Sequence, residues 1–532
     1  MVITPQTDVY LLKVPLEIDE INQLTFANAS SQFNYFNSLP KLGVDNFTYQ
    51  RKDGIIRFPA HFDDLVNYNY VMYRNEAYSN KWFYAFISGM DYLNDSTTAI
   101  SIKTDVWQTW QFDLTFRRMF VEREHVNDDS VGANTIDEGL ELGDYVINTS
   151  TTIKPNLTVL DNQGDPINGL KYPIFFQVTE LASGIGIASS LFDNGYNGLF
   201  SGLKYFAVTS YSAARSIITR YDSQGKGDAI VALFLAPVEF LSGAAVFGEL
   251  GYKIYIPQDT GRPTNLINTT TITRPSSLNG YTPTNNKLFC FPFSYVYVTN
   301  NAGIDSTFRY EDFNGNPKFM MAGALGQGCT IKLCPVSYKK YTDNTEVFEY
   351  GLSGAKYPIC AWSSDYYTNW VTQNAVNTGL SLASGFLSAG VNASYNNYTG
   401  AAGNLLSSVG GVMAQRYQAK VHPDQAKGNT NGSDILIGWE RYFTADCMSV
   451  RYEIARTIDN FFSMFGYKVN RLKVPNITGR RNWNYVKTVG CYIEADIPQD
   501  DLQEIKDMFN NGVTFWHNPS TFADYSQNND II

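Results

Sequence analysis

Apolar and polar side chains alternate near the start of the chain, which is the pattern of a half-buried strand. The apolar positions are Val9, Leu11, Val14 and Leu16. Further runs rich in β-branched and aromatic residues, bounded by turn residues, indicate more strands. These runs span 80–88, 291–298 and 484–494. The pattern therefore predicts a β-rich body, mainly β with a few helices.

Two segments near the C-terminus instead have apolar residues three or four apart, which predicts helices. In 499–510 the residues Leu502, Ile505, Met508 and Phe509 share one face, and the acidic residues at the start favour a helix N-terminus. The segment 450–465 has the same spacing. The last hundred or so residues are therefore expected to be mixed α and β.

A chain of 532 residues exceeds what one hydrophobic core usually supports, so several structural units are expected. No repeat of fixed period and no coiled-coil heptad interrupts the pattern, which disfavours solenoids and fibres. We divide the chain at changes in composition. The expected domains are 1–150, 151–360, 361–430 and 431–532.

Composition and charge exclude several classes of protein. Aromatic residues make up 15% of the chain, which favours strands, and the net charge of -11 disfavours binding of nucleic acid over the whole surface. Six cysteines are too few for a disulfide scaffold, and we expect synthesis in a reducing cytoplasm without a secretory leader. The cysteines and four histidines lack the spacing of a zinc site.

The segment 366–415 contains no Asp, Glu, Lys or Arg. As a helix, its first part, 371–391, would be about 31 Å long, close to the thickness of a bilayer core, about 30 Å. We predict a segment that enters a membrane under some conditions. A flexible linker or a buried hairpin of small residues is the alternative. The apolar residues expected to act in it are Val376, Leu380, Leu382, Phe386, Leu387, Val391, Leu405, Leu406, Val409, Val412 and Met413.

Small residues recur four apart in the same segment, the spacing that allows membrane helices to pack closely. A polar centre at 392–399 separates its two apolar runs and suggests a hairpin turn at a membrane interface. The small residues expected to pack are Gly379, Ala383, Gly385, Ala389, Gly403, Ser407 and Gly411.

Candidate chemistry elsewhere is weak. The run Arg123, Glu124 and His125 is followed by acidic residues without the spacing of a calcium loop, and nucleotide-binding and hydrolase motifs are absent. We therefore predict no catalytic residue, no metal and no cofactor. A basic patch is expected to contact a neighbouring subunit, although DNA phosphate is an alternative. It comprises Lys468, Arg471, Lys473, Arg480, Arg481 and Lys487.

Seven motifs stand near the two ends of the chain. They are 80–86 (NKWFYAF), 105–110 (DVWQTW), 121–126 (VEREHV), 134–140 (NTIDEGL), 465–471 (FGYKVNR), 484–491 (NYVKTVGC) and the pair 501–505 with 511–517 (DLQEI, NGVTFWH). In these motifs and their order, both ends of the chain resemble the tail knob (distal tail tube) proteins of the Picovirinae, short-tailed bacteriophages of Gram-positive bacteria.

This resemblance implies a structural protein at the tip of the phage tail, made in the host cytoplasm, and not an enzyme. The N- and C-terminal parts would form a tube-like β domain with an inserted knob domain, in a ring-shaped homohexamer. Its partners would be the tail collar or upper tube protein, the host cell membrane and viral DNA that passes through the lumen without sequence-specific binding. Residues 366–415 would plug the tube and then enter the membrane. A receptor-binding or wall-degrading tail component is the alternative.

Overall fold

A computed structural model of the chain describes residues 6–47, 54–155, 158–185, 204–257, 265–323, 331–339, 347–354, 360–363, 429–431 and 442–532. The chain forms two compact units, and each is made of separate stretches of sequence. Unit 1 consists of Met1–Asp144, Gly280–Phe293 and Arg451–Ile532, and unit 2 of Tyr145–Asn279 and Ser294–Val450. The backbone therefore passes from one unit to the other four times.

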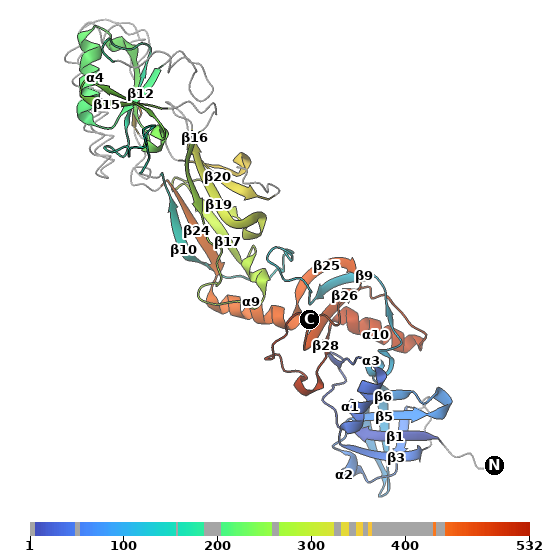
Figure 1. The fold of residues 1–532 in the computed structure, drawn as a ribbon. Helices are drawn as coiled ribbons and strands as arrows, with labels where there is room; N and C mark the ends of the chain where they lie inside the picture. The colour runs from blue at the N-terminus through green and yellow to red at the C-terminus, as the bar shows by residue number, and fades with distance from the viewer. Residues whose placement is uncertain are drawn as a thin grey trace. The chain divides into compact units, whose positions relative to one another are not determined.

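The first sheet of unit 1 begins with the strand predicted from alternation. In β1, Val9 and Leu11 are buried while Tyr10 between them is partly exposed, which confirms that prediction. The sheet has the order β3-β1-β5-β6-β7-β4, and all its pairs are antiparallel. Figure 1 shows β3, β1, β5 and β6 in this order. Its strands are β1 Thr7–Leu12, β3 Lys41–Phe47, β4 Ile55–Phe58, β5 Tyr70–Asn75, β6 Trp82–Asn94 and β7 Thr97–Thr104.

The second sheet of unit 1 combines strands from both ends of the chain. Its order is β2-β28-β26-β9-β25, so β9 lies between β26 and β25 (Figure 1). The predicted strand at 484–494 is divided between β26 and β27, and β27 pairs with β8. The strands are β2 Asn22–Leu24, β8 Thr115–Phe116, β9 Met119–Glu124, β25 Tyr467–Lys473, β26 Trp483–Val489, β27 Ile493–Glu494 and β28 Val513–Trp516.

Both predicted helices of unit 1 are present. They are α9 Tyr452–Phe465 and α10 Gln499–Asn511, and α10 buries the four residues predicted to share its inner face. Helix α10 packs against β26 and α3, which puts it on the core formed by the first and last parts of the chain. Three helices were not predicted: α1 Ala29–Ser38, α2 Phe62–Leu65 and α3 Val106–Trp110.

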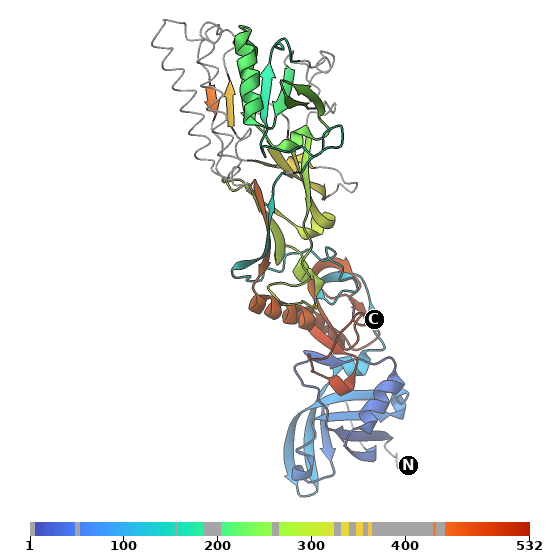
Figure 2. The same cartoon turned by 60° about the vertical axis from the view of Figure 1, so that its left-hand side comes forward.

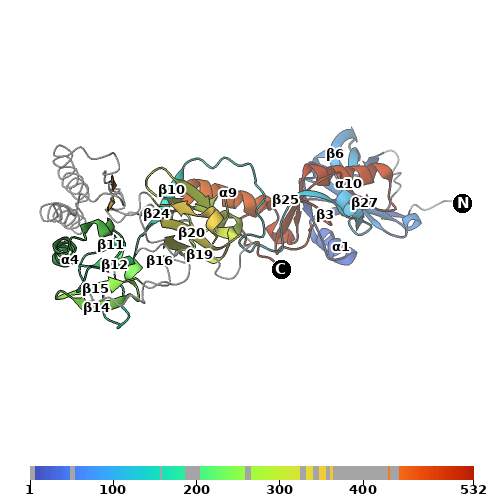
Figure 3. The same ribbon diagram turned by 90° about the horizontal axis from the view of Figure 1, so that it is seen from above.

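The described residues of unit 2 form three sheets and a hydrophobic core of their own. The predicted strand at 291–298 corresponds to β17, whose neighbour β24 also pairs with β10; β10 and β24 lie side by side in Figure 3. The order is β10-β24-β17-β18 in the first sheet and β16-β19-β20-β21 in the second. Their strands are β10 Tyr145–Ile153, β16 Asn265–Thr271, β17 Ser294–Thr299, β18 Asp305–Phe308, β19 Phe313–Gly323, β20 Ile331–Tyr338, β21 Leu352–Ser353 and β24 Phe443–Val450.

The third sheet of unit 2 has the order β14-β15-β12-β11-β13-β22-β23. Helix α4 Tyr211–Ser223, also absent from the prediction, packs against β12 (Figure 2). Strands β22 and β23 pair antiparallel, with Ser363 opposite Asn429. The strands are β11 Ile174–Val178, β12 Lys204–Val208, β13 Ile230–Leu235, β14 Ala245–Glu249, β15 Tyr252–Ile256, β22 Cys360–Ser363 and β23 Asn429–Asn431.

The uncharged segment lies outside the described residues, and with it the predicted plug and packing residues between Val376 and Met413. Its flanks are β22 and β23, so the two ends of the intervening chain, 364–428, come together at the paired residues Ser363 and Asn429. Within the described ranges, no helix combines the length and apolar character needed to cross a bilayer.

A buried ionic cluster as the candidate functional site

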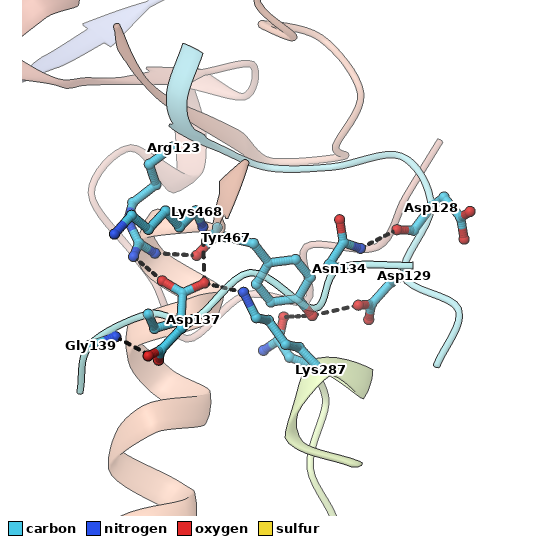
Figure 4. Close-up of polar contacts among 12 residues, drawn as sticks. Arg123, Asp128, Asp129, Asn134, Asp137, Gly139, Lys287, Tyr467 and Lys468 are labelled. Atoms are coloured by element: carbon cyan, nitrogen blue, oxygen red, sulfur yellow. Dashed lines mark hydrogen bonds and ion pairs between the residues drawn. The ribbon is translucent and has the colours of Figure 1, made fainter. Parts of the chain in front are cut away.

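The motifs at 121–126 and 134–140 meet around the carboxylate of Glu138 in unit 1. Arg123 Nη2 and Lys287 Nζ both form ion pairs with it, and the backbone N–H of Lys468 donates to its Oε1 at 3.0 Å (Figure 4). Only 1% of the Glu138 side chain and 2% of the Lys287 side chain are exposed. One carboxylate therefore joins three segments that are remote in sequence.

A second carboxylate extends this cluster. Asp129 accepts a hydrogen bond from the Tyr467 hydroxyl (Figure 4). It also accepts one, at 3.0 Å, from the backbone N–H of Asn286. Burial raises the pKa of Asp129, while the hydrogen bonds from Tyr467 and Asn286 oppose that rise. Burial also lowers the pKa of Lys287, although the adjacent Glu138 favours its charged form. Lys287 and Glu138 therefore compensate each other's lost hydration.

Helix α9 holds the short segment Gly280–Phe293 through Asp459. The Asp459 carboxylate accepts from the Tyr281 hydroxyl at 2.8 Å and from the backbone N–H groups of Thr284 and Asn285 at 2.8 and 2.9 Å. The Asn285 side chain donates in turn to Ser463 Oγ at 2.8 Å. A carboxylate with several N–H and O–H donors is well compensated in a buried position. The segment is thereby fixed to unit 1, although residues on both sides of it belong to unit 2.

His125 and Glu124 also form hydrogen bonds or ion pairs within the chain. His125 Nδ1 accepts from the backbone N–H of Tyr485 at 2.8 Å, which leaves the proton on Nε2 to be donated to Ser463 O at 3.1 Å. Burial lowers the pKa of His125 to about 3, so the ring is neutral near pH 7. Glu124 pairs with Lys473 and accepts from the backbone N–H of Asn476 at 2.8 Å. Neither ring nitrogen of His125 is available to a metal ion.

The residues of the predicted basic patch differ in burial and in their partners. Lys473 and Lys487 form ion pairs with Glu124 and Glu122 of the same chain, and the buried Arg480 donates to Val126 O at 3.0 Å. Two of these partners, Glu122 and Glu124, lie on β9. The contact of the patch with a neighbouring subunit stays a prediction. Lys468 is partly buried; Arg471 and Arg481 are exposed.

The contacts of this cluster hold together segments that are remote in sequence. The cluster consists of ion pairs and hydrogen bonds, and within the described ranges no group of three or more His, Cys, Asp and Glu side chains could hold a metal ion. Sequence reasoning identified Glu138 and Asp129 only as members of an acidic run. It missed Lys287, Tyr467 and Asp459, which no local pattern connects with that run.

Two family models match the chain. The C-terminal domain of the tail knob protein gp9 of Bacillus phage phi29 matches residues 261–530. The N-terminus of the caudoviral major tail protein matches residues 5–115. The first match therefore includes β17, β24, α9, β25 and β26, and the second includes all six strands of the first sheet of unit 1.

Curated relatives and a solved structure agree with these models. The tail knob proteins gp9 of Bacillus phages PZA and phi29 are 26% and 25% identical to the chain, and in each case the alignment covers 98% of both proteins. The structure of the bacteriophage C1 tail knob protein, gp12, has a TM-score of 0.66 and 15% sequence identity, and covers 99% of this chain and 100% of that one. That likeness establishes a shared fold.

Proposed function

Because the chain belongs to the family of phage tail knob proteins, we propose that it assembles as a hexameric ring and forms the distal tube of the tail. Like its relatives, the chain is a structural component of the virion tail. It is not an enzyme. In the ring, the parts 1–150 and 431–532 build the tube wall and 151–360 builds the knob. The upper tube or collar protein is the neighbour, and DNA passes through the lumen without sequence-specific contacts.

We further propose that the segment 366–415 plugs the tube and then enters the host membrane, so that the genome can be ejected. The observation that carries this proposal is the absence of any Asp, Glu, Lys or Arg among these residues. Each ionised side chain placed at a bilayer centre costs about 2.5–3.5 kcal/mol on insertion scales, so a segment without them can enter at far lower cost.

The pairing of β22 with β23 supports the same proposal. Because Ser363 lies opposite Asn429, the two residues to which 364–428 are attached are neighbours in the seven-stranded sheet. A segment attached in this way can change its environment without moving the strands that hold it. It can also be replaced by a two-residue Asn-Gly turn, which suits an antiparallel pair.

The test is release of a dye from liposomes at mildly acidic and neutral pH, comparing the intact protein with a variant in which the Asn-Gly turn replaces residues 364–428. Leakage should be lost in the shortened variant, whose retained fold is checked by its melting temperature. In the full-length segment, Leu380→Asp should reduce leakage strongly and Leu380→Ala only slightly, because only the first adds a charge. Equal leakage from all four proteins would overturn the membrane role, and sugar released from purified cell wall would favour a wall-degrading component instead.

A further inference from the structure

A pocket in unit 2 lies on the outer face of helix α4. Its volume is about 430 Å³, which is in the range of sites that bind small molecules, and it is open to solvent. The helix supplies most of its lining, and the turn between β14 and β15 supplies the rest. The described residues that line it are Arg215, Ser216, Thr219, Arg220, Ser223 and Leu250. Apart from the leucine, all of them carry hydrogen-bond donors, so the pocket fits a polar ligand.

The two arginines flank the hydroxyl groups on this face of the helix. Residues three or four apart are neighbours on a helix surface, so three hydroxyl side chains project between Arg215 and Arg220. These hydroxyls belong to Ser216, Thr219 and Ser223. All five side chains are exposed or partly exposed, and a ligand can therefore reach them. A ligand that contacts the hydroxyls has a guanidinium group on either side.

The loop at Ser183 and Gly184 holds one of the two arginines in place. Gly184 has a φ of +82°, and a Cβ at that position would lie 3.4 Å from Arg220 Nη2, so the guanidinium lies close to the backbone of this loop. The Gln224 side chain fixes the loop, since it accepts from the backbone N–H of Ser183 and donates to its carbonyl, both at 2.7 Å. A side chain that is already positioned loses less conformational entropy when a ligand binds.

Neither arginine is neutralised by a nearby carboxylate. Across the described ranges, Arg215 and Arg220 form no ion pair, and the described lining of the pocket contains no acidic side chain. Glu180, which precedes the loop at Gly184, pairs instead with Lys226 at 3.1 Å. Two unpaired cations in one pocket stand out in a chain whose net charge is -11. The pocket therefore attracts an anion.

The donors around the pocket match a phosphate better than a carboxylate. A guanidinium group donates two parallel hydrogen bonds to oxygens of a phosphate or a carboxylate. A phosphate has more than two acceptor oxygens, in a tetrahedral arrangement. It can therefore accept from Arg215 and Arg220 on opposite sides and from a hydroxyl of the helix between them, whereas a planar carboxylate cannot reach all three.

Leu250 provides an apolar wall. With Gly251 it forms the two-residue turn of the β14–β15 hairpin, in which Glu249 pairs with Tyr252. The φ values of Leu250 and Gly251 are 51° and 78°, and such a turn favours Asn-Gly over a leucine. The Leu250 side chain packs against the core of unit 2 and also lines the pocket. It can thus contact the carbon atoms of a ligand whose phosphate lies between the arginines.

We propose that this pocket binds the phosphate ester of a small polyol, with its phosphate group between Arg215 and Arg220. The hydroxyl side chains of α4 donate to the remaining phosphate oxygens and accept from the hydroxyl groups of the polyol, while Leu250 contacts its carbon atoms. Duplex DNA matches less well, because its binding requires a row of cations along successive phosphates. The site belongs to unit 2 and does not depend on the proposed ring or membrane segment.

The test is isothermal titration calorimetry of the full chain with glycerol 3-phosphate. Inorganic phosphate should bind more weakly, and glycerol should not bind. Arg215→Gln and Arg220→Gln should each raise the dissociation constant for glycerol 3-phosphate by at least about tenfold. The control is Arg118→Gln, which removes an exposed arginine of unit 1 and should leave the affinity unchanged. Because Arg215 is exposed, the melting temperature of its variant should equal that of the wild type.

A substitution at Leu250 separates the role of the pocket wall from that of the fold. Leu250→Asn places a residue that tolerates the positive φ in the turn, so the melting temperature should not fall sharply. The affinity for glycerol 3-phosphate should fall nevertheless, and that for inorganic phosphate should not change. An unchanged affinity for both would refute the contact between Leu250 and the carbon atoms of the ligand.

Other outcomes would overturn the site itself. If the wild-type chain does not bind glycerol 3-phosphate, the proposal is wrong. Equal affinities of the wild type, Arg215→Gln and Arg220→Gln would place any binding outside this pocket. A duplex oligonucleotide that displaces glycerol 3-phosphate from the wild type, and binds Arg215→Gln more weakly, would replace the polyol phosphate with DNA as the ligand.

Discussion

Lys287 and Glu138 form an ion pair in which both side chains are almost completely buried. They are 149 positions apart in sequence, and Lys287 lies in the short segment that returns to unit 1 between two parts of unit 2. Removing one partner of a buried pair leaves an uncompensated charge, which is more costly than the pair is favourable. The pair therefore acts as a condition for correct docking of this segment.

Replacement of Glu138 by Gln should destabilise unit 1 by about 3–5 kcal/mol, because the buried Lys287 ammonium loses its counter-charge. Urea unfolding followed by tryptophan fluorescence measures the change. The exposed Glu141 provides the matched control, and Glu141→Gln should differ from the wild type by less than about 0.5 kcal/mol. Similar stability of the two variants would contradict the role assigned to the cluster.

Gly466, which ends α9, should not tolerate alanine. Its φ is +64°, and an added Cβ would overlap the Glu124 carbonyl oxygen and lie 2.6 Å from the His125 nitrogen. Gly490 has a similar φ of +67° with nothing within 4 Å of an added Cβ. Gly490→Ala should therefore cost only the backbone strain, about 1–2 kcal/mol, and Gly466→Ala several kcal/mol more. Melting temperatures of the two variants compare the costs directly.

Glu20 should make unit 1 less stable as the pH rises. Burial raises its pKa from 4.5 to about 7, and the nearby Glu504 adds to this rise while Lys103, 3.2 Å away, opposes it. Because the folded state holds the proton more tightly, this contribution is complete below about pH 4.5 and is lost as the pH approaches 7. Glu20→Gln should remove a decline of the order of 1–2 kcal/mol between these values.

Urea unfolding at several pH values between 4.5 and 8 measures this contribution. The exposed Glu17 is the control, and Glu17→Gln should retain the wild-type profile. Parallel profiles for wild type and Glu20→Gln would argue against a protonated Glu20 in the folded protein.

His125 should have the opposite dependence. Burial lowers its pKa from 6.5 to about 3, so the unfolded chain takes up the proton first as the pH falls. The stability that His125 contributes is therefore complete above pH 6.5 and declines toward pH 3. His125→Asn should be less stable at pH 7, since the bond to Ser463 is lost, but its stability should decline less between pH 6.5 and 4. An unchanged slope would contradict the neutral, buried ring.

The parts of the fold that were predicted correctly are those with a strong local period. Helix α10 places Leu502, Ile505 and Met508 on one buried face. Their spacing can be recognised in the sequence without knowledge of the tertiary structure. Helix α1 was missed because its sequence, ASSQFNYFNS, is poor in strong helix formers. Its start is fixed by a capping box between Asn28 and Ser31, a signal that depends on hydrogen bonds more than on hydrophobicity.

The ionic cluster could not be derived in the same way. Glu138 and Asp129 stand in an acidic stretch, and nothing in that stretch distinguishes a solvated carboxylate from one paired with Lys287. The partner is selected by the way the backbone passes between the units, which is a tertiary property. The ion pairs of the basic patch could not be derived for the same reason, since the pairing of β9 with β25 and β26 gives Lys473 and Lys487 their acidic neighbours.

The division of unit 1 into separate stretches also sets the order of events during synthesis. The hydrogen bond from Arg123 to the Gly466 carbonyl joins residues 343 positions apart, so β9 has no partner strand while the ribosome makes the intervening chain. Closing so long a loop is slow, and unit 1 is completed only when the last strands have emerged. A prematurely terminated chain thus lacks the partner strands of β9 and cannot complete the second sheet. Only a fully translated chain can therefore form a complete unit 1.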